Sequence, residues 1–362
     1  MRPSWVEIDL GAIRHNVRSI AEVVSPAAIA AVVKADAYGH GDVPVAEAAL
    51  EAGATWLAVA TVAEGIRLRE ADLSAPILLL SEPLASDLEE AQRYQLTPTG
   101  YTGDFLPALR KIGEGPIAPH VKLDTGMHRV GADHASALEM ARGLDEKSQL
   151  GGLWTHFPDA EGNAEFTKQQ IDQLARLVEA VRGEGIDPGI VHAANSAGAL
   201  LYPESRWDMV RIGLAMYGCY PSPECRDVVE LRPAMRVVSR VAHVQQLPAG
   251  SRPSYGRIRP LEGDGVVATV PIGYADGVTR RLSRAGGSVL IGGKRRPYAG
   301  SVTMDQIIVV GSDEVAVGDE VVLLGAQGEE TIEADEWAGL LDTVSWEILC
   351  GFGPRLPRRY QE

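Results

Sequence analysis

The sequence has few of the features that mark secreted, membrane-spanning or disulfide-linked proteins. Its three cysteines, Cys219, Cys225 and Cys350, form no CxxC pair, and an odd number argues against a disulfide framework. The longest apolar run, Ala27–Val33, is far shorter than the roughly 20 residues of a membrane-spanning helix. The N-terminal sequence MRPSWVE contains no apolar signal region. We therefore expect a cytoplasmic protein from a reducing compartment.

Basic charge is also scarce. The chain has 34 Lys and Arg against 49 Asp and Glu, a formal net charge of −15. This acidic balance argues against non-specific binding to nucleic acid. Hydrophobic residues make up 45% of the sequence and charged residues 23%, which is ordinary for a globular protein. At 362 residues, the chain is long enough for two domains, or for one large barrel with a smaller partner.

Short apolar runs alternate with amphipathic segments over the first two-thirds of the chain. Thr167–Arg182, for example, has Leu174, Leu177 and Val178 on one helical face. Eight such strand–helix units in about 230 residues match a (β/α)8 barrel. The rival fold, a doubly wound open sheet, would begin with a GxGxxG turn, which is absent. We predict an N-terminal TIM barrel, residues 1–232, with strands at Ala28–Val33, Thr55–Ala60, Pro76–Leu80, Leu96–Tyr101, Ile117–Leu123, Leu150–His156, Gly189–Ala193 and Asp208–Ile212.

The pattern changes after Arg232, where β-branched runs are separated by Gly, Pro and Asp turns. This pattern predicts a mainly antiparallel β domain over residues 233–362. One helix is expected at Ala334–Leu349. The expected strands are Val237–Gln245, Gly265–Val270, Ser288–Ile291, Ile307–Val310 and Glu320–Leu324.

A lysine follows the first predicted strand at the end where TIM barrels carry their active sites. Lys34 lies there beside a dry β interior, where desolvation lowers the pKa of a lysine and makes it a usable nucleophile. A plain surface lysine is the ordinary alternative. Tyr38 comes four residues later, next to Gly39 and Gly41, whose flexible backbone suits a turn around a ligand.

Further polar residues converge on the same predicted rim. Lys122, His156 and Arg211 each end or follow a strand, although His156 can be a core histidine and Arg211 an ion-pair partner. The loops after strands seven and eight, where barrels commonly bind phosphate, contain Ser196, Gly213 and Leu214. A lysine nucleophile combined with a phosphate site suggests pyridoxal phosphate. The sequence has no HExxH, clustered Cys/His or EF-hand pattern that would favour a metal site.

Nine motifs, in order and across both predicted domains, resemble those of the alanine racemases, a pyridoxal-phosphate-dependent family of fold type III. The resemblance covers essentially the whole chain. Two departures are Phe157–Gly162, a less regular loop than usual, and Thr303, where a cysteine is frequent. The motifs are AVVKADAYGHG (31–41), VKLDTGMHRVG (121–131), THF (155–157), HAANSA (192–197), MVRIGLAMYG (209–218), SYG (254–256), PIGYADG (271–277), MDQ (304–306) and RLPRRY (355–360).

The resemblance implies a role for specific residues in these motifs. Lys34 binds the cofactor covalently and is one catalytic base, and Tyr255 is the base on the opposite face. Arg211 faces the pyridine nitrogen, Arg129 contacts the ring hydroxyl and the substrate, and Lys122 is a site of carbamylation paired with Arg129. The other implied cofactor contacts are Tyr38, His156, Asn195, Ser196, Gly213, Leu214 and Tyr360, and the other substrate contacts are Tyr274, Met304 and Asp305.

The implied reaction is the racemisation of alanine by an isomerase. It needs a proton removed on one face of Cα and supplied on the other, while the cofactor delocalises the carbanion. A tyrosine base needs cationic neighbours, for which Arg211 and His156 are candidates. Arg211 stays charged and does not readily release a proton, so the ring nitrogen stays unprotonated and transamination should be suppressed. From the residues alone, Tyr255 and Tyr274 can equally be half-buried tyrosines and Met304 a core residue.

Three other functions stay open at this point. A pyridoxal-phosphate decarboxylase of similar build is expected to have a carboxylate at the ring nitrogen, so Arg211 argues against it. A cofactor carrier would need the barrel alone. A racemase of broad specificity would differ only in its pocket. The family resemblance implies a homodimer with composite sites, because Lys34 and Tyr255 lie about 220 residues apart in different domains. It also implies supply of D-alanine for peptidoglycan.

Overall fold

The computed structural model describes residues 2–113, 115–145 and 150–362. The chain divides into two compact units, one of Ala12–Ala37 with Asp42–Arg232, and one of Met1–Gly11, Tyr38–Gly41 and Pro233–Glu362. The N-terminal residues and the short segment at Tyr38–Gly41 therefore cluster with the β-rich unit, whereas the sequence placed them in residues 1–232. The prediction that residues 1–232 bind the cofactor and residues 233–362 form a separate β domain stays a prediction.

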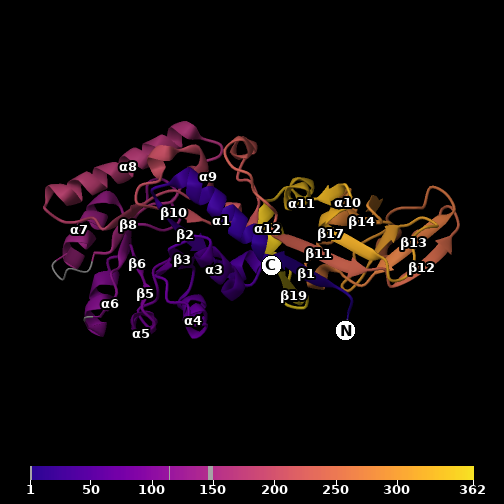
Figure 1. Cartoon of the computed structure of the whole chain (residues 1–362), viewed down its shortest axis with the longest axis horizontal. Coiled ribbons are helices and arrows are strands. Elements are labelled where there is room, and N and C mark those ends of the chain that lie inside the picture. Colours follow the sequence, from indigo (N-terminus) through magenta and orange to yellow (C-terminus); the bar gives the residue numbers. More distant parts are fainter. Residues whose placement is uncertain (1, 114, 146–149) are drawn as a thin grey trace. The chain divides into compact units, whose positions relative to one another are not determined.

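The first unit is a parallel barrel (Figure 1). Its strands pair in the orders β10-β2-β3-β4-β5 and β6-β7-β8-β9. Pro98 separates β5 from β6, so these two short strands occupy one place, and Asp208 N–H donates to Val191 O (3.0 Å) between β9 and β10. All eight predicted strand positions are occupied. The strands are β2 (Ala28–Val32), β3 (Trp56–Val59), β4 (Ile77–Leu79), β5 (Leu96–Thr97), β6 (Thr99–Gly100), β7 (His120–Lys122), β8 (Gly152–Trp154), β9 (Ile190–His192) and β10 (Met209–Ile212).

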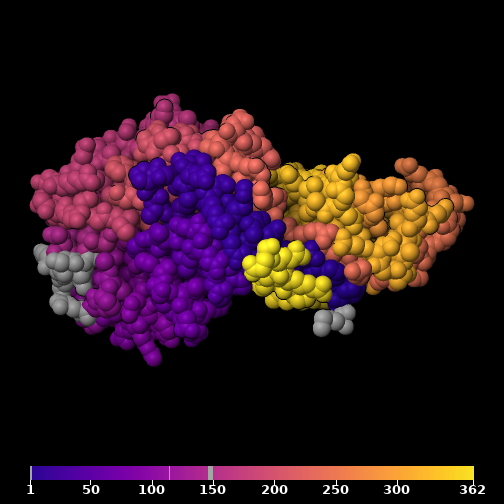
Figure 2. Space-filling model, in the orientation of Figure 1, coloured from indigo at the N-terminus to yellow at the C-terminus, as the bar shows by residue number. Residues whose placement is uncertain are grey.

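Helices follow most of the barrel strands. The last strand is instead followed by two 3-10 helices, and α1 packs beside them: Asn16 donates to Met216 O (3.0 Å) and Arg232 O (2.8 Å). Figure 2 shows α1 in indigo next to the salmon-coloured end of the barrel unit. The helices are α1 (Leu10–Val24), α2 (Lys34–Gly39), α3 (Asp42–Glu51), α4 (Val62–Glu70), α5 (Leu88–Arg93), α6 (Phe105–Ile112), α7 (His134–Asp145), α8 (Ala164–Gly183) and α9 (Ser196–Leu201), with η1 (Pro203–Ser205), η2 (Leu214–Tyr217) and η3 (Pro223–Asp227).

The second unit is built on two sheets. The larger has the order β15-β14-β17-β11-β1-β19, with β18 paired to β17, and the smaller is β12-β13-β16. Every pairing is antiparallel except β1 with β19. The strands are β1 (Trp5–Asp9), β11 (Met235–Arg240), β12 (His243–Leu247), β13 (Gly265–Val270), β14 (Ser288–Ile291), β15 (Lys294–Pro297), β16 (Ile307–Val310), β17 (Glu320–Gln327), β18 (Glu330–Ile332) and β19 (Arg358–Gln361).

Two predicted elements of this unit are each divided. The run Val237–Gln245 belongs to β11 and β12, which lie in different sheets, and the expected helix at Ala334–Leu349 is broken at Asp342, whose φ is 56°. The predictions of one strand and one helix were wrong, because the apolar pattern does not show where the chain leaves one sheet for another or where a left-handed residue ends a helix. The helices here are η4 (Tyr255–Arg257), η5 (Tyr274–Asp276), α10 (Leu282–Ala285), α11 (Ala334–Leu341) and α12 (Ser345–Cys350).

Candidate active site

Lys34 lies two residues after the end of β2 and begins an unusual turn. Residues Ala35 to Tyr38 all have left-handed φ values between 51° and 55°. Such a conformation costs roughly 1–2 kcal/mol for each residue with a Cβ, so neighbouring contacts must hold it. Glu64 provides one of them, because its carboxylate accepts hydrogen bonds from Ala35 N–H (2.7 Å) and Ala60 N–H (2.8 Å). The sequence predicted flexibility at Gly39 and Gly41, and both have positive φ, but it did not predict the left-handed residues before them.

Arg211 on β10 is buried in the barrel and holds several of its neighbours. Its guanidinium donates to Thr155 O (2.8 Å), Ala193 O (2.9 Å) and Nδ1 of His192 (2.6 Å). It also lies 3.1 Å from His156 Nδ1. Burial lowers the pKa of Arg211 to about 9, so the side chain stays charged at neutral pH. Among the described residues, no carboxylate forms a salt bridge with Arg211, so the alternative of an Arg–carboxylate ion pair is not realised.

The histidines around Arg211 are neutral. Burial, followed by the charge of Arg211, lowers the pKa of His156 and of His192 well below 6.5 and that of His120 to about 3. The expectation that His156 adds positive charge to the site is therefore wrong, because burial and then the cations beside it lower its pKa and keep it unprotonated. Arg211 remains as the permanent positive charge at this position.

Lys122, the last residue of β7, lies among other cations. Burial and then the charges of Arg211 and Arg129 lower its pKa to about 7, and Lys34 contributes in the same direction. The Lys122 ammonium lies 4.4 Å from the ring centroid of Trp154, and the Arg211 guanidinium lies 4.6 Å from it. Cations over an indole face are favourable, but their mutual repulsion remains. An anionic group bound at this rim would relieve it.

The loops after β9 and β10 are joined through one hydroxyl. Ser196 Oγ accepts hydrogen bonds from Gly213 N–H (3.2 Å) and Ala215 N–H (3.3 Å), and its own hydrogen is left to donate to a ligand. Leu214 begins η2 between these two amides. Asn195 caps α9, since its side chain accepts from Gly198 N–H (2.9 Å). The cationic rim and this hydroxyl fit the phosphate and the negative ring oxygen of pyridoxal phosphate.

Two predicted phosphate contacts lie together in the other unit. Gly41 has a φ of 97°, and a Cβ built on it would lie 2.0 Å from the Tyr360 hydroxyl, so only glycine allows this approach. Tyr38 belongs to the same short segment, and its carbonyl lies 3.1 Å from Nδ1 of His40. Burial, and then Cys350, raises the pKa of Tyr38 to about 12, so its hydroxyl stays protonated and can donate.

The predicted β-unit residues are exposed. The side chains of Tyr255, Tyr274 and Met304 are 71%, 44% and 53% accessible to solvent. Asp305 follows Met304 and accepts a hydrogen bond from the Arg355 guanidinium (2.7 Å). The predicted site residues thus lie in two sets, one in the barrel unit and one in the β unit.

Residues 8–221 match the family model "Alanine racemase, N-terminal domain", and residues 234–360 match "Alanine racemase, C-terminal domain". The chain belongs to the alanine racemase family. It is 44% identical to the alanine racemase of Symbiobacterium thermophilum, covering 99% of this chain and 97% of that protein, and 42% identical to that of Nostoc sp., covering 98% and 95%. The crystal structure of alanine racemase from Bacillus anthracis with bound L-Ala-P has a TM-score of 0.94 at 38% identity, covering 100% and 96% of the two chains.

Alanine racemases are pyridoxal-phosphate-dependent isomerases, so the family agrees with the fold and with the cofactor class suggested by the rim. No helix in the described part of the chain is both long and apolar enough to cross a membrane.

Three buried residues of this alanine racemase fold were missed by the sequence analysis. His192 Nε2 lies 2.9 Å from His120 Nδ1, and the Trp154 ring stacks on His192 with centroids 5.4 Å apart. The available signal was the spacing of His120 and Lys122, which places both side chains on one face of a strand. The family motifs assign no role to these three residues, although HAANSA begins at His192.

Proposed function

We propose that this chain interconverts L- and D-alanine by two-base proton transfer, with Lys34 and Tyr255 as the bases. The observation that carries the proposal is the position of Lys34, a lysine at a barrel strand end close to Lys122 and Arg211, in a member of the alanine racemase family. Pyridoxal phosphate, when bound, delocalises the carbanion and so makes the Cα–H of alanine acidic enough for a side-chain base.

Most of the residues that would hold that cofactor belong to the barrel unit, and Tyr38 and Tyr360 belong to the β unit. Lys34 binds it covalently, and Arg211 faces the pyridine nitrogen as a group that donates hydrogen bonds without releasing a proton. The five proposed phosphate contacts are Tyr38, Ser196, Gly213, Leu214 and Tyr360. His156 and Asn195 support the site through Arg211 and the α9 cap, and Arg129 contacts the ring hydroxyl.

Lys122 is the proposed site of carbamylation. A pKa of about 7 leaves much of the amine unprotonated at neutral pH, and an unprotonated amine adds to carbon dioxide with release of one proton. The carbamate would replace a cation by an anion near Arg129 and Arg211, which would remove the repulsion described above.

Tyr255 would act on the opposite face of the substrate. An exposed tyrosine is poorly placed for proton transfer unless another surface excludes water from it. We propose that a second copy of the chain covers Tyr255, Tyr274 and Met304, so that each site of a homodimer combines Lys34 of one protomer with Tyr255 of its partner. Met304 and Asp305 then lie at the substrate carboxylate, with Tyr274 bordering the substrate. A cytoplasmic enzyme of this kind would supply D-alanine for peptidoglycan.

A chiral assay tests the function. The protein loaded with pyridoxal phosphate is incubated separately with alanine, serine, lysine and arginine, and both enantiomers are quantified. We expect rapid racemisation of alanine and slow or no racemisation of the others. Borohydride reduction of the same preparation should place the cofactor on Lys34. Release of carbon dioxide without racemisation would instead support the decarboxylase alternative, and similar rates for lysine or arginine would support broad specificity.

A further inference from the structure

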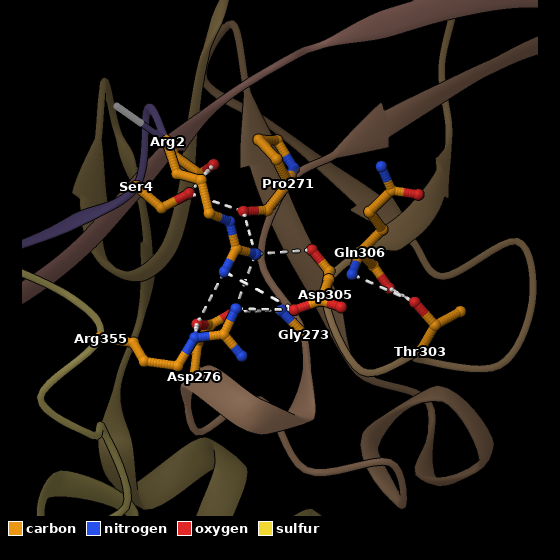
Figure 3. Close-up of polar contacts among 10 residues, drawn as sticks. Arg2, Ser4, Pro271, Gly273, Asp276, Thr303, Asp305, Gln306 and Arg355 are labelled. Atoms are coloured by element: carbon orange, nitrogen blue, oxygen red, sulfur yellow. Dashed lines mark hydrogen bonds and ion pairs between the residues drawn. The ribbon is translucent and has the colours of Figure 1, made fainter.

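A buried carboxylate connects three distant parts of the β unit. Asp276, at the end of η5, is fully inaccessible to solvent. It accepts hydrogen bonds from Gly273 N–H (2.9 Å) and from both terminal nitrogens of Arg2 (3.1 Å each). The Arg355 Nε lies 3.3 Å from the same carboxylate. Figure 3 shows both guanidinium groups converging on Asp276.

The two arginines also hold a second loop. Arg2 Nη2 donates to the carbonyl oxygens of Asp305 (2.7 Å) and Pro271 (2.8 Å), and Arg355 Nη2 donates to the Asp305 carboxylate (2.7 Å). Each arginine therefore bridges the loop around Asp276 and the loop around Asp305. Charge-assisted hydrogen bonds of this kind are about twice as strong as neutral ones.

These two loops are bonded directly as well. Tyr274 N–H donates to Thr303 O (3.0 Å), and Ala275 N–H donates to Met304 O (3.0 Å). A Cβ on Gly273 would lie 2.3 Å from Thr303 O, so the loops approach as closely as glycine allows. The loops that carry Tyr274 and Met304 are thus hydrogen-bonded to each other along their backbones.

The turn that carries Tyr255 joins the beginning of the same loop. Ser254 Oγ donates to Ser301 O (2.6 Å), and a Cβ on Gly300 would lie 2.3 Å from Pro253 O. We call Asp276 with its partners Arg2 and Arg355 the Asp276 cluster. Tyr255 is connected to this cluster through residues 301–304, whereas the loops of Tyr274 and Met304 contact it directly.

Tyr274 and Met304 are exposed, so the hydrogen bonds that fix their backbones matter for where their side chains lie. Side chains that are 44% and 53% accessible have few packing neighbours of their own to fix them, so their positions depend on the backbone beneath. We infer that Arg2, Asp276 and Arg355 are positioning residues, which set the Tyr274 and Met304 backbones for the carboxylate of alanine. This inference rests on the proposed function for its kinetic consequence, but its structural consequence is independent of activity.

The test compares the variants Arg2→Met, Arg2→Lys and Asp276→Asn with the control Arg295→Met, all loaded with cofactor. Arg295 is a matched control, because it is 39% accessible against 37% for Arg2 and bridges Glu330 and Glu336 elsewhere in the same unit. We expect Arg2→Met and Asp276→Asn to raise the KM for alanine about tenfold and to change kcat less than about threefold, since ground-state positioning is lost. Arg2→Lys keeps the charge and should recover part of the change.

Hydrogen exchange supplies a readout that does not need activity. The amides of Tyr274 and Ala275 should exchange faster in Arg2→Met and stay at the wild-type rate in Arg295→Met. A KM within twofold of wild type together with unchanged exchange in Arg2→Met and Asp276→Asn would overturn the inference, as would equal effects from Arg295→Met. If Asp276→Asn does not fold, Arg355→Met takes its place. If the wild-type protein does not racemise alanine but Arg2→Met still exchanges faster than wild type, the positioning role is supported and the proposed function is rejected.

Discussion

His120 is the third member of a hydrogen-bond chain that runs from Arg211 through His192. Because the Arg211 guanidinium donates to His192 Nδ1, the hydrogen of His192 must lie on Nε2, which donates to His120 Nδ1. Both imidazoles are then neutral, so neither repels the positive charge of Arg211. The chain fixes the direction of the guanidinium that we propose for the pyridine nitrogen.

Because His120 is neutral in the folded protein, the free energy of unfolding depends on pH. The pKa of His120 is about 3 in the folded protein and near 6.5 when unfolded. Between these values only the unfolded state binds the proton, so the free energy of unfolding falls as pH drops from about 6.5 towards 3. His120→Gln keeps an acceptor for His192 and removes this proton, so the fall should be shallower than in wild type by about 1.4 kcal/mol per pH unit. Urea unfolding at pH 6.5, 5.5 and 4.5 measures it, and parallel slopes would contradict the account.

At the scale of elements, the left-handed turn formed by residues 35–38 connects Lys34 to the short segment that contains Gly41. Gly41 lies three residues after Tyr38, the last residue of this turn, and its missing Cβ leaves room for the Tyr360 hydroxyl. Both tyrosines proposed for the phosphate, Tyr38 and Tyr360, therefore depend on the backbone of this short segment.

Gly41→Ala tests that dependence, with Gly53→Ala as its control. Both glycines have positive φ, 97° and 112°, so both variants carry a similar backbone strain of roughly 1–2 kcal/mol. Only at Gly41 would the new Cβ collide with Tyr360, because nothing lies within 4 Å of a Cβ at Gly53. We expect a loss of pyridoxal phosphate affinity of about tenfold in Gly41→Ala alone, measured by equilibrium titration of the cofactor. Equal losses in both variants would show that strain, and not Tyr360, is responsible.

Elements differ in how far the sequence predicts them. The eight barrel strands were predictable because parallel strands are buried on both faces and form apolar runs. The edge strand β19 was missed because Arg358–Gln361 is charged and exposed, and the Asp276 cluster was missed because Arg2 lies 274 positions from its partner. The charge state of His156 depends on its neighbours in space, which no motif encodes. Lys34, Lys122 and Arg211 were found because strand ends share one rim.

At the scale of the whole molecule, the two units contribute different groups to the proposed reaction. The barrel unit has the lysine, the buried cations and the hydroxyl of Ser196. The β unit has Tyr255 and the anchored loops of Tyr274 and Met304. The high exposure of these three side chains is the structural reason for proposing that a second copy covers them.

Mixing two inactive variants tests this account most directly. Lys34→Ala and Tyr255→Phe are each prepared as homodimers, dissociated together and reassembled, with sizing to confirm the dimer. Random pairing makes about half of the dimers mixed, and a shared site gives each mixed dimer one intact and one doubly damaged site. The account predicts that racemase activity returns to about a quarter of the wild-type value. Activity near zero in reassembled mixed dimers would contradict it, because each site would then be built within one chain.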